Sequence, residues 1–406
     1  MFTTSVQALK ASITQNQPFC SGTIPLSSKN AVIFYKEDVK SNWIDLSHPT
    51  ENALQSLAGA CQPATFGVNQ RDVLDEAYRK AGKMDNTDFA TTFDLNQARL
   101  LDMISAQLLS ESKENESITA ELYKLNVYGK DSFFKAHKDT PRGKAMFGSL
   151  VVVYPTQHEG GALILRHGGK EWTFDSADAV RKHDGPAIAY VAFFSDVEHE
   201  VAVVTSGYRV TLTYNLYFVD DNAPSTLRPD IMTGFEAAFT TALNDPAFLP
   251  SGGLLGFGLA FQYPFSPGKS NLGNLLSRLK GSDAVIKQVC NRLSLHEEYT
   301  DGHIMVNQIP DLARIGEIEE PISSILLHGY GGRMVHDIGD GIPGGQGEEQ
   351  APNALKILWI TPLTGVMQFQ SSYLAYGNEA SLECIYGDVC LVAQVGPVGQ
   401  RATKAN

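Results

Sequence analysis

The sequence has few cysteines and lacks long apolar runs, and each of these absences argues against certain classes of protein. The five cysteines among 406 residues form no Cys-x-x-Cys pair, which argues against a disulfide framework and a zinc site. The first seventeen residues, MFTTSVQALKASITQNQ, lack the apolar core of a secretory signal. The longest apolar runs, such as residues 187–194, are far too short to span a bilayer. We therefore expect a soluble intracellular protein of the cytoplasm or nucleus, without membrane contact.

Positive charge is also scarce. The 32 Lys and Arg residues are outnumbered by 45 Asp and Glu residues, which gives a formal net charge of −13. Sequence-independent binding to nucleic acid needs clustered Lys and Arg side chains that displace counterions, so we expect no nucleic-acid partner. The sequence also contains no Gly-x-Ser-x-Gly elbow of a hydrolase. Its apolar content of 43% and charged content of 19% are those of a folded globular protein.

The middle of the chain has the period of β-strands. Between residues 121 and 218, apolar residues alternate with polar ones or form short runs that end at glycine or proline. This spacing predicts a sandwich or barrel and not βαβ units. Within residues 208–218, Arg209, Thr211 and Thr213 should share one face of a strand, because alternate side chains point the same way. The seven predicted strand segments are 121–128, 147–155, 160–167, 170–176, 187–195, 199–205 and 208–218.

Two histidines and one carboxylate form a candidate metal site. His137 and Asp139 are two positions apart, so on a strand both side chains point to the same side. A second His-x-acid triplet at His296 shows that this pattern alone is weak. His199 supplies a third candidate ligand. Two histidines and one carboxylate leave coordination positions open and form the facial triad of non-haem Fe(II) oxygenases.

Ten residues after His199 stands Arg209, in a strand that carries no other charge. An unpaired cation is costly to bury, so an anionic ligand is expected there. A guanidinium can hold a carboxylate through two parallel hydrogen bonds. Thr211 and Tyr128 are candidates to add hydroxyl hydrogen bonds to the same ligand, although both residue types are also common in sheets for packing reasons.

From residue 122 to residue 218 the chain resembles the Fe(II)/2-oxoglutarate-dependent dioxygenases of the prolyl 4-hydroxylase-like branch. The resemblance rests on Tyr128-Gly129, His137-Lys138-Asp139, the segment 159–163 (EGGAL), His199-Glu200-Val201, and Gly207 leading to Arg209. It implies an α+β fold with a mainly β core, a double-stranded β-helix or jelly-roll, N-terminal buttressing helices and a C-terminal α/β extension. The implied domains are an N-terminal helical support region at 1–120, the dioxygenase core at 121–220, and a C-terminal region of unknown role at 226–406.

The same resemblance implies the chemistry. His137, Asp139 and His199 would hold Fe(II), and Arg209 would bind the distal carboxylate of 2-oxoglutarate with help from Tyr128 and Thr211. O2 is the oxidant, and ascorbate is a further cofactor that the family allows. Because a carboxylate stands at Asp139, the resemblance implies hydroxylation and not halogenation. Many prolyl 4-hydroxylases have lysine where this chain has Arg209, which leaves the substrate class open.

The expected reaction is hydroxylation of a prolyl or other residue in a protein or peptide, with release of succinate and CO2. The alternatives are a hydroxylase of a small metabolite, a non-catalytic binding module on the same fold, and an oxidative demethylase of nucleic acid, which the net charge disfavours. Around the metal motif, Lys135, Lys138, Arg142 and Lys144 form a basic cluster, either a solvated loop or a site that attracts an anionic substrate. Trp172 and Phe193 are candidates either for the pocket wall or for the core.

The flanks carry coarser predictions. Residues 31–35 are predicted as a short strand, and residues 72–84 and 95–109 as helices. The second helix has Asp94 as its N-cap and an apolar stripe of Leu101, Ile104 and Leu108. In the C-terminal region we expect helices at 231–243 and 272–293, a glycine-rich loop at 336–352, and strands at 354–363 and 382–395.

Overall fold

The structure is a computed structural model. It describes residues 3–13, 17–38, 40–68, 71–109, 118–143, 145–219, 234–263, 273–276, 278–293, 304–310, 335–337, 355–375 and 381–401. The chain divides into two compact units. One contains residues 17–110 and 115–225, and the other contains residues 1–16, 111–114 and 226–406. None of the described helices is long and apolar enough to cross a membrane.

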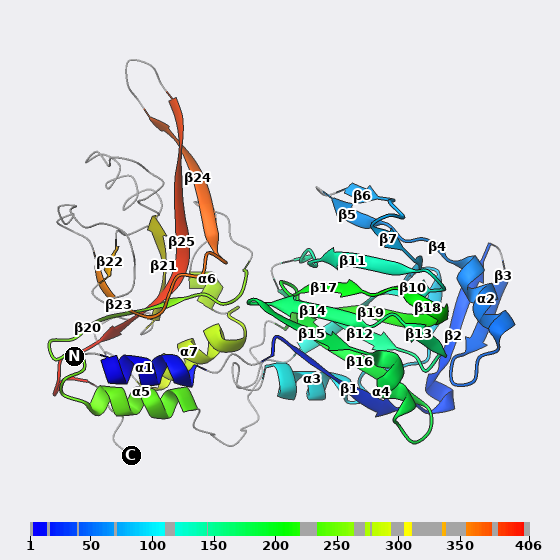
Figure 1. Cartoon of the computed structure of the whole chain (residues 1–406), viewed down its shortest axis with the longest axis horizontal. Helices are drawn as coiled ribbons and strands as arrows, with labels where there is room; N and C mark the ends of the chain where they lie inside the picture. Colours follow the sequence, from blue (N-terminus) through cyan, green and yellow to red (C-terminus); the bar gives the residue numbers. More distant parts are fainter. Residues whose placement is uncertain are drawn as a thin grey trace. The chain divides into compact units, whose positions relative to one another are not determined.

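The first unit is built on a seven-stranded antiparallel sheet (Figure 1). Its central strands carry alternating side chains of which one set is fully buried, as at Val210, Leu212 and Tyr214. β16 is buried along its whole length, which explains why its sequence is a continuous apolar run and not an alternating one. The strands, in spatial order, are β1 (Phe19–Pro25), β16 (Ala187–Phe194), β12 (Met146–Val153), β19 (Arg209–Phe218), β10 (Ile118–Tyr128), β8 (Gly82–Asp85) and β4 (Gln62–Pro63).

A second antiparallel sheet of five strands belongs to the same unit. Its order is β15 (Lys170–Phe174), β14 (Leu163–His167), β17 (Glu198–Val201), β11 (Phe133–His137) and β7 (Arg79–Lys80). A further antiparallel pair joins β13 (His158–Gly160) to β18 (Val204–Gly207). Each of the seven predicted segments between residues 121 and 218 contains a strand, but the segment 199–205 is divided between β17 and β18, which belong to different sheets. The mainly β, antiparallel architecture is consistent with the predicted jelly-roll. Between β15 and β16 the structure adds a short helix, α4 (Ser176–Arg181), that the sequence analysis did not predict.

Residues 17–110 are richer in strands than predicted. The predicted strand at 31–35 is confirmed as β2 (Val32–Glu37), which pairs with β3 (Lys40–Asp45) and β9 (Phe89–Thr91). The predicted helix at 72–84 is wrong, because these residues contribute to β6 (Arg71–Val73), β7 and β8. β6 pairs with β5 (Phe66–Val68), whereas β8 pairs with β10, which places Met84 opposite Leu125. Pairing with partners far away in sequence therefore overrides the local helical pattern.

Two helices accompany these strands, α2 (Glu51–Ala60) and α3 (Leu100–Leu108), along with a short 3-10 helix at Ser28–Asn30. The predicted helix at 95–109 is thus confirmed in its second part. Asp94 accepts hydrogen bonds from the backbone N–H groups of Asn96 and Gln97, but the chain turns once more before α3 begins. The fully buried stripe is Leu100, Ile104 and Leu108, so Leu100 takes the position predicted for Leu101.

The second unit combines helices with a mixed sheet. The helices are α1 (Thr3–Ser12), α5 (Gly234–Asn244), α6 (Gly273–Leu276) and α7 (Gly281–Arg292), and α1 packs against α5. The sheet order is β21 (Ile304–Pro310), β25 (Ser381–Val395), β20 (Gly253–Gly258), β23 (Leu355–Thr361) and β22 (Val335–Asp337), with β24 (Gln368–Ala375) also paired to β25. The final strands predicted for this region are confirmed as β23 and β25, and the helix at 231–243 is confirmed as α5 from Gly234 onward. The helix predicted at 272–293 is instead divided into α6 and α7. Most of the predicted loop at 336–352 lies outside the described residues, although residues 336 and 337 belong to β22.

One carboxylate is buried in this second unit. Asp283, in the first turn of α7, is 1% exposed. It accepts hydrogen bonds from the backbone N–H groups of Ala260 (3.0 Å) and Phe261 (3.3 Å) and from the Tyr263 hydroxyl (2.8 Å). Burial raises the pKa of Asp283 to about 7. The carboxyl group therefore ties the chain after β20 to the start of α7.

Candidate metal and cosubstrate site

A cavity of about 240 Å³ lies in the first unit, lined by residues of both its large sheets. The seven-stranded sheet contributes residues of β10, β12, β16 and β19, and the five-stranded sheet contributes residues of β7, β11, β14 and β17. All six residues that the sequence analysis singled out as site residues line this cavity: Tyr128, His137, Asp139, His199, Arg209 and Thr211. The fold therefore brings together positions that are up to 83 residues apart in the sequence.

The three candidate metal ligands converge. One ligand atom each from His137, Asp139 and His199 lies within 4.8 Å of the other two. His137 and His199 sit directly opposite each other on the antiparallel strands β11 and β17, with ring centroids 4.2 Å apart. The His199 Nε2 atom lies 3.9 Å from Asp139 Oδ1. This spacing is suited to a single metal ion held by three side chains on one side.

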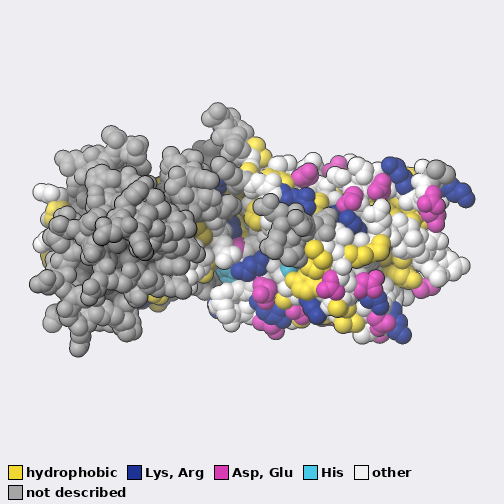
Figure 2. Space-filling view, turned by 90° about the horizontal axis from the view of Figure 1, so that it is seen from above, with side chains coloured by type: hydrophobic (Ala, Val, Ile, Leu, Met, Phe, Trp, Pro, Cys, Tyr) yellow, Lys and Arg dark blue, Asp and Glu magenta, His cyan; other side chains and the backbone are white. Residues whose placement is uncertain are grey.

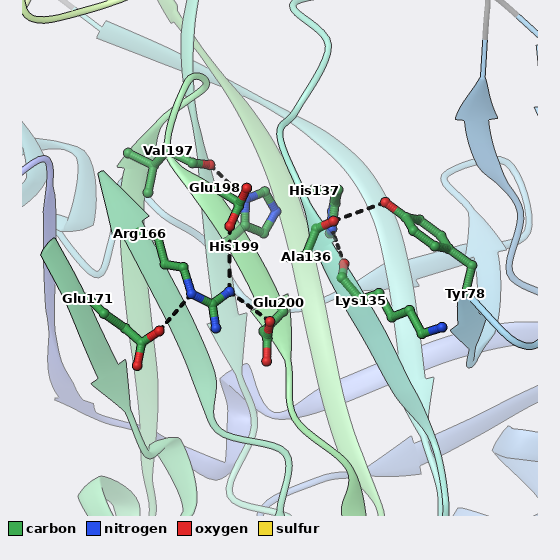
Figure 3. Close-up of polar contacts among 10 residues, drawn as sticks. All are labelled: Tyr78, Lys135, Ala136, His137, Arg166, Glu171, Val197, Glu198, His199 and Glu200. Carbon is green, nitrogen blue, oxygen red and sulfur yellow. Dashed lines mark hydrogen bonds and ion pairs between the residues drawn. The ribbon is translucent and has the colours of Figure 1, made fainter. Parts of the chain in front are cut away.

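Both imidazole rings are oriented by the backbone. The Nδ1 atom of His137 is 2.8 Å from the Lys135 carbonyl oxygen, and that of His199 is 3.1 Å from the Val197 carbonyl oxygen (Figure 3). A carbonyl oxygen can only accept, so in each ring Nδ1 carries the hydrogen and the Nε2 lone pair is left for a metal. Burial, together with the neighbouring His199, lowers the pKa of His137 and keeps its ring neutral, as metal binding requires.

Asp139 is held by a residue that sequence reasoning missed. The hydroxyl group of Ser149, on β12, donates to Asp139 Oδ2 at 2.5 Å. Ser149 is 2% exposed and lies in the opposite sheet. With Oδ2 engaged in this way, Oδ1 remains the oxygen closer to His199. No motif marks Ser149 in the sequence, where it is one small residue in an apolar strand.

Arg209 is a buried cation that forms no ion pair among the described residues, although the Asp175 carboxylate attracts it at longer range. It is 1% exposed, and its Nε atom has no hydrogen-bond partner. Burial lowers the pKa of Arg209 from its usual value. The Tyr128 ring lies beside it, with its centroid 5.5 Å from the guanidinium carbon, and Thr211 is buried on the same face of β19. Burying such a charge alone is unfavourable, so the site is built for an anion.

The glycine pair of the segment 159–163 has a packing role beside Arg209. Gly161 has φ +69°, and a Cβ atom added there would lie 2.9 Å from Arg209 Cδ and 2.9 Å from Val204 Cγ2. Gly160 has φ +73°, and a Cβ atom added there would lie only 2.2 Å from the Val203 carbonyl oxygen. Both residues need a backbone conformation that favours glycine. The missing side chain at Gly161 leaves the space through which the Arg209 stem passes.

The strand that carries His199 is fixed on its outer side by ion pairs (Figure 3). Arg166, on β14, binds Glu200 at 2.7 Å and Glu171 at 2.6 Å, and its Nη1 atom lies 3.6 Å from Glu198. Glu198 and Glu200 flank His199 on β17, so their side chains point away from the imidazole. The cluster links β15, β14 and β17 next to the ligand. Arg166 is partly solvent-exposed, so each pair contributes little stability by itself.

Other predicted residues divide between the cavity and its surroundings. Phe193 lines the cavity, with its ring centroid 4.5 Å from that of His199, whereas Trp172 is not a lining residue and packs on Phe19. Of the predicted basic cluster, Lys138 and Arg142 line the cavity and Lys135 does not. Lys144 lies outside the described residues.

Comparison with known proteins identifies the central segment. Residues 123–217 match the family model of the 2OG-Fe(II) oxygenase superfamily. No curated protein matches the chain.

Solved structures with some similarity include a 2OG-Fe(II) oxygenase family oxidoreductase from Burkholderia pseudomallei, with 19% identity, coverage of 30% of this chain and 54% of that chain, and a TM-score of 0.24. A prolyl-4-hydroxylase from Pseudomonas putida has 18% identity, 52% and 98% coverage, and a TM-score of 0.31. A Trichoplax adhaerens prolyl hydroxylase, solved with a peptide fragment of hypoxia inducible factor, has 15% identity, 53% and 90% coverage, and a TM-score of 0.32. The chain thus spans about half of the Burkholderia protein. Because all three TM-scores are below 0.5, these structures add no support to the family match.

The donor set fits the cofactors that this family implies, which are Fe(II), 2-oxoglutarate and O2. Two neutral imidazoles and one carboxylate are the ligands of non-haem iron, and an unpaired guanidinium in the same cavity suits a dicarboxylate. Both observations come from the site itself and agree with the family model. Residues 123–217 of this chain therefore resemble the 2OG-Fe(II) oxygenase superfamily both in sequence and in the geometry of the site.

Proposed function

We propose that this chain is an Fe(II)- and 2-oxoglutarate-dependent hydroxylase that acts on a prolyl or other residue of a protein or peptide. In the net reaction a substrate C–H group, O2 and 2-oxoglutarate yield the hydroxylated substrate, succinate and CO2, so one oxygen atom of O2 enters the new hydroxyl group and the other enters succinate. The observation that carries the proposal is the buried, unpaired Arg209 in the same cavity as the metal trio. The choice of a peptide substrate rests on the resemblance to the prolyl 4-hydroxylase-like branch.

His137, Asp139 and His199 would hold the metal. When bound, Fe(II) supplies the activation of O2 and the oxidation of the substrate C–H group. The protein keeps both histidines in the tautomer that offers Nε2, through the Lys135 and Val197 carbonyl groups. Ser149 keeps Asp139 in one orientation. Three side-chain ligands leave the remaining coordination positions for the cosubstrate and O2.

Arg209 would bind the carboxylate of 2-oxoglutarate that is farther from the metal. Its guanidinium is fixed by burial, and the Gly161 backbone leaves room for its stem. Tyr128 and Thr211 would add hydroxyl hydrogen bonds to the same carboxylate. A cation that is already desolvated before the ligand arrives binds a carboxylate strongly, because little solvation remains to be lost.

Aromatic side chains would exclude water around the metal. The Phe134 ring stacks on His137, with centroids 3.6 Å apart, and Phe193 lies against His199. Both phenylalanines line the cavity and are buried. They replace water beside the imidazoles with an apolar wall, which strengthens electrostatic interactions inside the site. In this proposal residues 121–220 are the catalytic core, and residues 226–406 have no assigned part in the chemistry.

The test needs no knowledge of the substrate. The apoprotein is titrated anaerobically with Fe(II) and then with 2-oxoglutarate, and the weak visible charge-transfer band of the chelate is recorded. A band that is absent from His137→Ala and weakened in Arg209→Ala supports the proposal. A folded, iron-loaded wild-type protein that shows no band would refute it and would favour a non-catalytic binding module.

A further inference from the structure

The cavity is far more positive than the chain that contains it. Among the described residues that line it, the only carboxylate is Asp139. The cationic side chains there are Arg79, Lys124, Lys138, Arg142 and Arg209. On the face shown in Figure 2, by contrast, Lys and Arg side chains alternate with Asp and Glu side chains. Positive charge is therefore concentrated at this site, although the formal net charge of the chain is −13.

2-Oxoglutarate and Asp139 do not balance this excess. Asp139 is assigned to a divalent metal, and the dianionic cosubstrate would engage that metal and Arg209. Lys124 lies 3.8 Å from Asp85, Lys138 is exposed, and Arg142 is exposed and stacks on the Tyr123 ring. Arg79 remains, a buried cation that the proposed function does not use.

Arg79 is held in place by neutral groups. It is 8% exposed, donates through Nη1 to the Thr65 carbonyl oxygen at 2.8 Å, and donates through Nη2 to Asn126 Oδ1 at 2.9 Å. Its Nε atom has no hydrogen-bond partner. Asn126 is fixed in turn because its Nδ2 atom donates to Thr213 Oγ1 at 3.0 Å. The guanidinium is thus pre-oriented but not neutralised, which is a costly arrangement unless an anion completes it.

Arg79 is also close to the metal ligands. Its guanidinium carbon lies 4.3 Å from the centroid of the Phe134 ring, and the same ring stacks on His137 at 3.6 Å. Arg79 and Arg209 both line the cavity that contains the metal trio. A substrate group bound at Arg79 would therefore lie one aromatic ring away from the ligand His137.

We propose that Arg79 is a specificity-determining residue that binds a carboxylate of the substrate. This inference rests on the proposed function and extends it to the substrate class. The substrate is a carboxylate-bearing molecule, which means either a peptide with an acidic residue next to the reacting residue or a free amino acid or related small acid. The two sources share the group that Arg79 would bind, and the experiment separates them.

The experiment uses matched acid and amide probes on the full chain. One set is proline-centred hexapeptides with Glu or Gln on either side of the proline, and the other set is N-acetylated amino acids as free acids or as amides. Binding is measured anaerobically by calorimetry with Fe(II) and 2-oxoglutarate present, and succinate formation is measured in air. The wild type should bind one acid set about tenfold to hundredfold more tightly than its amides, since a hydrogen bond to a charged group contributes about 1.5–3 kcal/mol.

Arg79→Gln should remove the preference for acid over amide and leave the affinity for amide probes unchanged. Arg79→Lys should keep part of the preference for acid over amide, because lysine retains the charge but not the two parallel hydrogen bonds of a guanidinium. Arg99→Gln, which removes an exposed cation outside the cavity, should change the preference no more than about twofold. If Arg79 has only a structural role, Arg79→Gln should weaken the binding of acid and amide probes alike, and that result would overturn the inference.

Equal binding of acids and amides by the wild type, or binding of neither set, would also overturn it, and this measurement needs no variant to fold. The charge-transfer band of iron and 2-oxoglutarate separates this outcome from failure of the proposed function. A wild type that shows the band but no acid preference refutes the role of Arg79 alone. A wild type without the band refutes the hydroxylase proposal.

Discussion

His137 and His199 are direct cross-strand partners, on β11 and β17 of the five-stranded sheet. Their rings are 4.2 Å apart, and each Nδ1 atom is fixed by the carbonyl group two residues before it. Antiparallel pairing brings opposite side chains within about 5 Å of each other on one face of a sheet. The sheet register thus creates the two-histidine half of the metal site, and Asp139 completes it just after β11 ends.

Loss of either histidine should abolish metal-dependent turnover. In His137→Ala and His199→Ala, two protein ligands remain, and we expect Fe(II) affinity to fall by at least about a hundredfold. Anaerobic Fe(II) titration and 2-oxoglutarate-dependent succinate formation measure the two effects. His48→Ala is the control, because His48 is exposed and lies outside the cavity. Full turnover in either ligand variant would contradict the site assignment.

Ser149→Ala should lower Fe(II) affinity without removing a ligand. The substitution deletes the hydrogen bond that orients Asp139, and groups that orient metal ligands typically contribute about tenfold to a hundredfold in affinity or activity. Ser149→Thr, which keeps the hydroxyl group, tests whether the hydrogen bond and not the size of the residue matters. The measurement is an Fe(II) binding isotherm with 2-oxoglutarate present. An unchanged isotherm in Ser149→Ala would rule out this role.

Arg209→Ala should weaken 2-oxoglutarate binding by about tenfold to a hundredfold and leave Fe(II) binding nearly unchanged, since it removes the cation and not a metal ligand. Arg209→Lys should bind 2-oxoglutarate with an affinity between those of the wild type and Arg209→Ala, because lysine keeps the charge but cannot form the second hydrogen bond. Calorimetric titration of the iron-loaded protein with 2-oxoglutarate gives the affinities. Equal cosubstrate affinity in wild type and Arg209→Ala would refute the anchor role.

Gly161→Ala should reproduce part of the loss of 2-oxoglutarate affinity expected for Arg209→Ala. The new Cβ atom would come within 2.9 Å of Arg209 Cδ, and the positive φ adds roughly 1–2 kcal/mol of strain. Gly168→Ala is a matched control with φ +55° and no neighbouring atom within 4 Å. Both variants should lose stability in chemical denaturation, but only Gly161→Ala should raise the KM for 2-oxoglutarate. An equal effect on KM in both variants would count against the packing argument.

The second unit should become less stable as pH rises through the acidic range. The pKa of Asp283 is about 7 in the folded chain and 3.8 for an unperturbed carboxyl group. Between these values the folded state holds a proton that the unfolded state has released, so stability falls with rising pH until about 7 and then levels off.

Amide hydrogen exchange at Ala260 and Phe261, whose N–H groups donate to Asp283, reports this change locally. After correction for intrinsic rates, protection should drop roughly tenfold or more between pH 4 and pH 7. Asp283→Asn should flatten the dependence, because the amide does not ionise. A persistent slope in that variant would assign the pH effect to another group.

Local pattern was sufficient to predict the central strands and the residues that face the site. The period of two in residues 208–218 placed Arg209, Thr211 and Thr213 on one face, and all three line the cavity. This prediction succeeds because side-chain direction along a strand is a property of the local backbone. The same rule predicted His137 and Asp139 on one face of a strand, but β11 ends at His137, so the chain after the strand and not strand alternation brings Asp139 to His137.

Only the tertiary structure revealed the residues that reach the site across sheets. Ser149 contacts Asp139 from the opposite sheet, and Arg79 enters on a two-residue strand inside a segment that the sequence pattern predicted as a helix. Pairing between distant strands leaves little trace in a short segment, because its hydrogen-bond partners and packing neighbours come from elsewhere in the chain. The sequence by itself therefore determined the candidate metal ligands and the candidate cosubstrate cation, whereas long-range pairing decided what surrounds them.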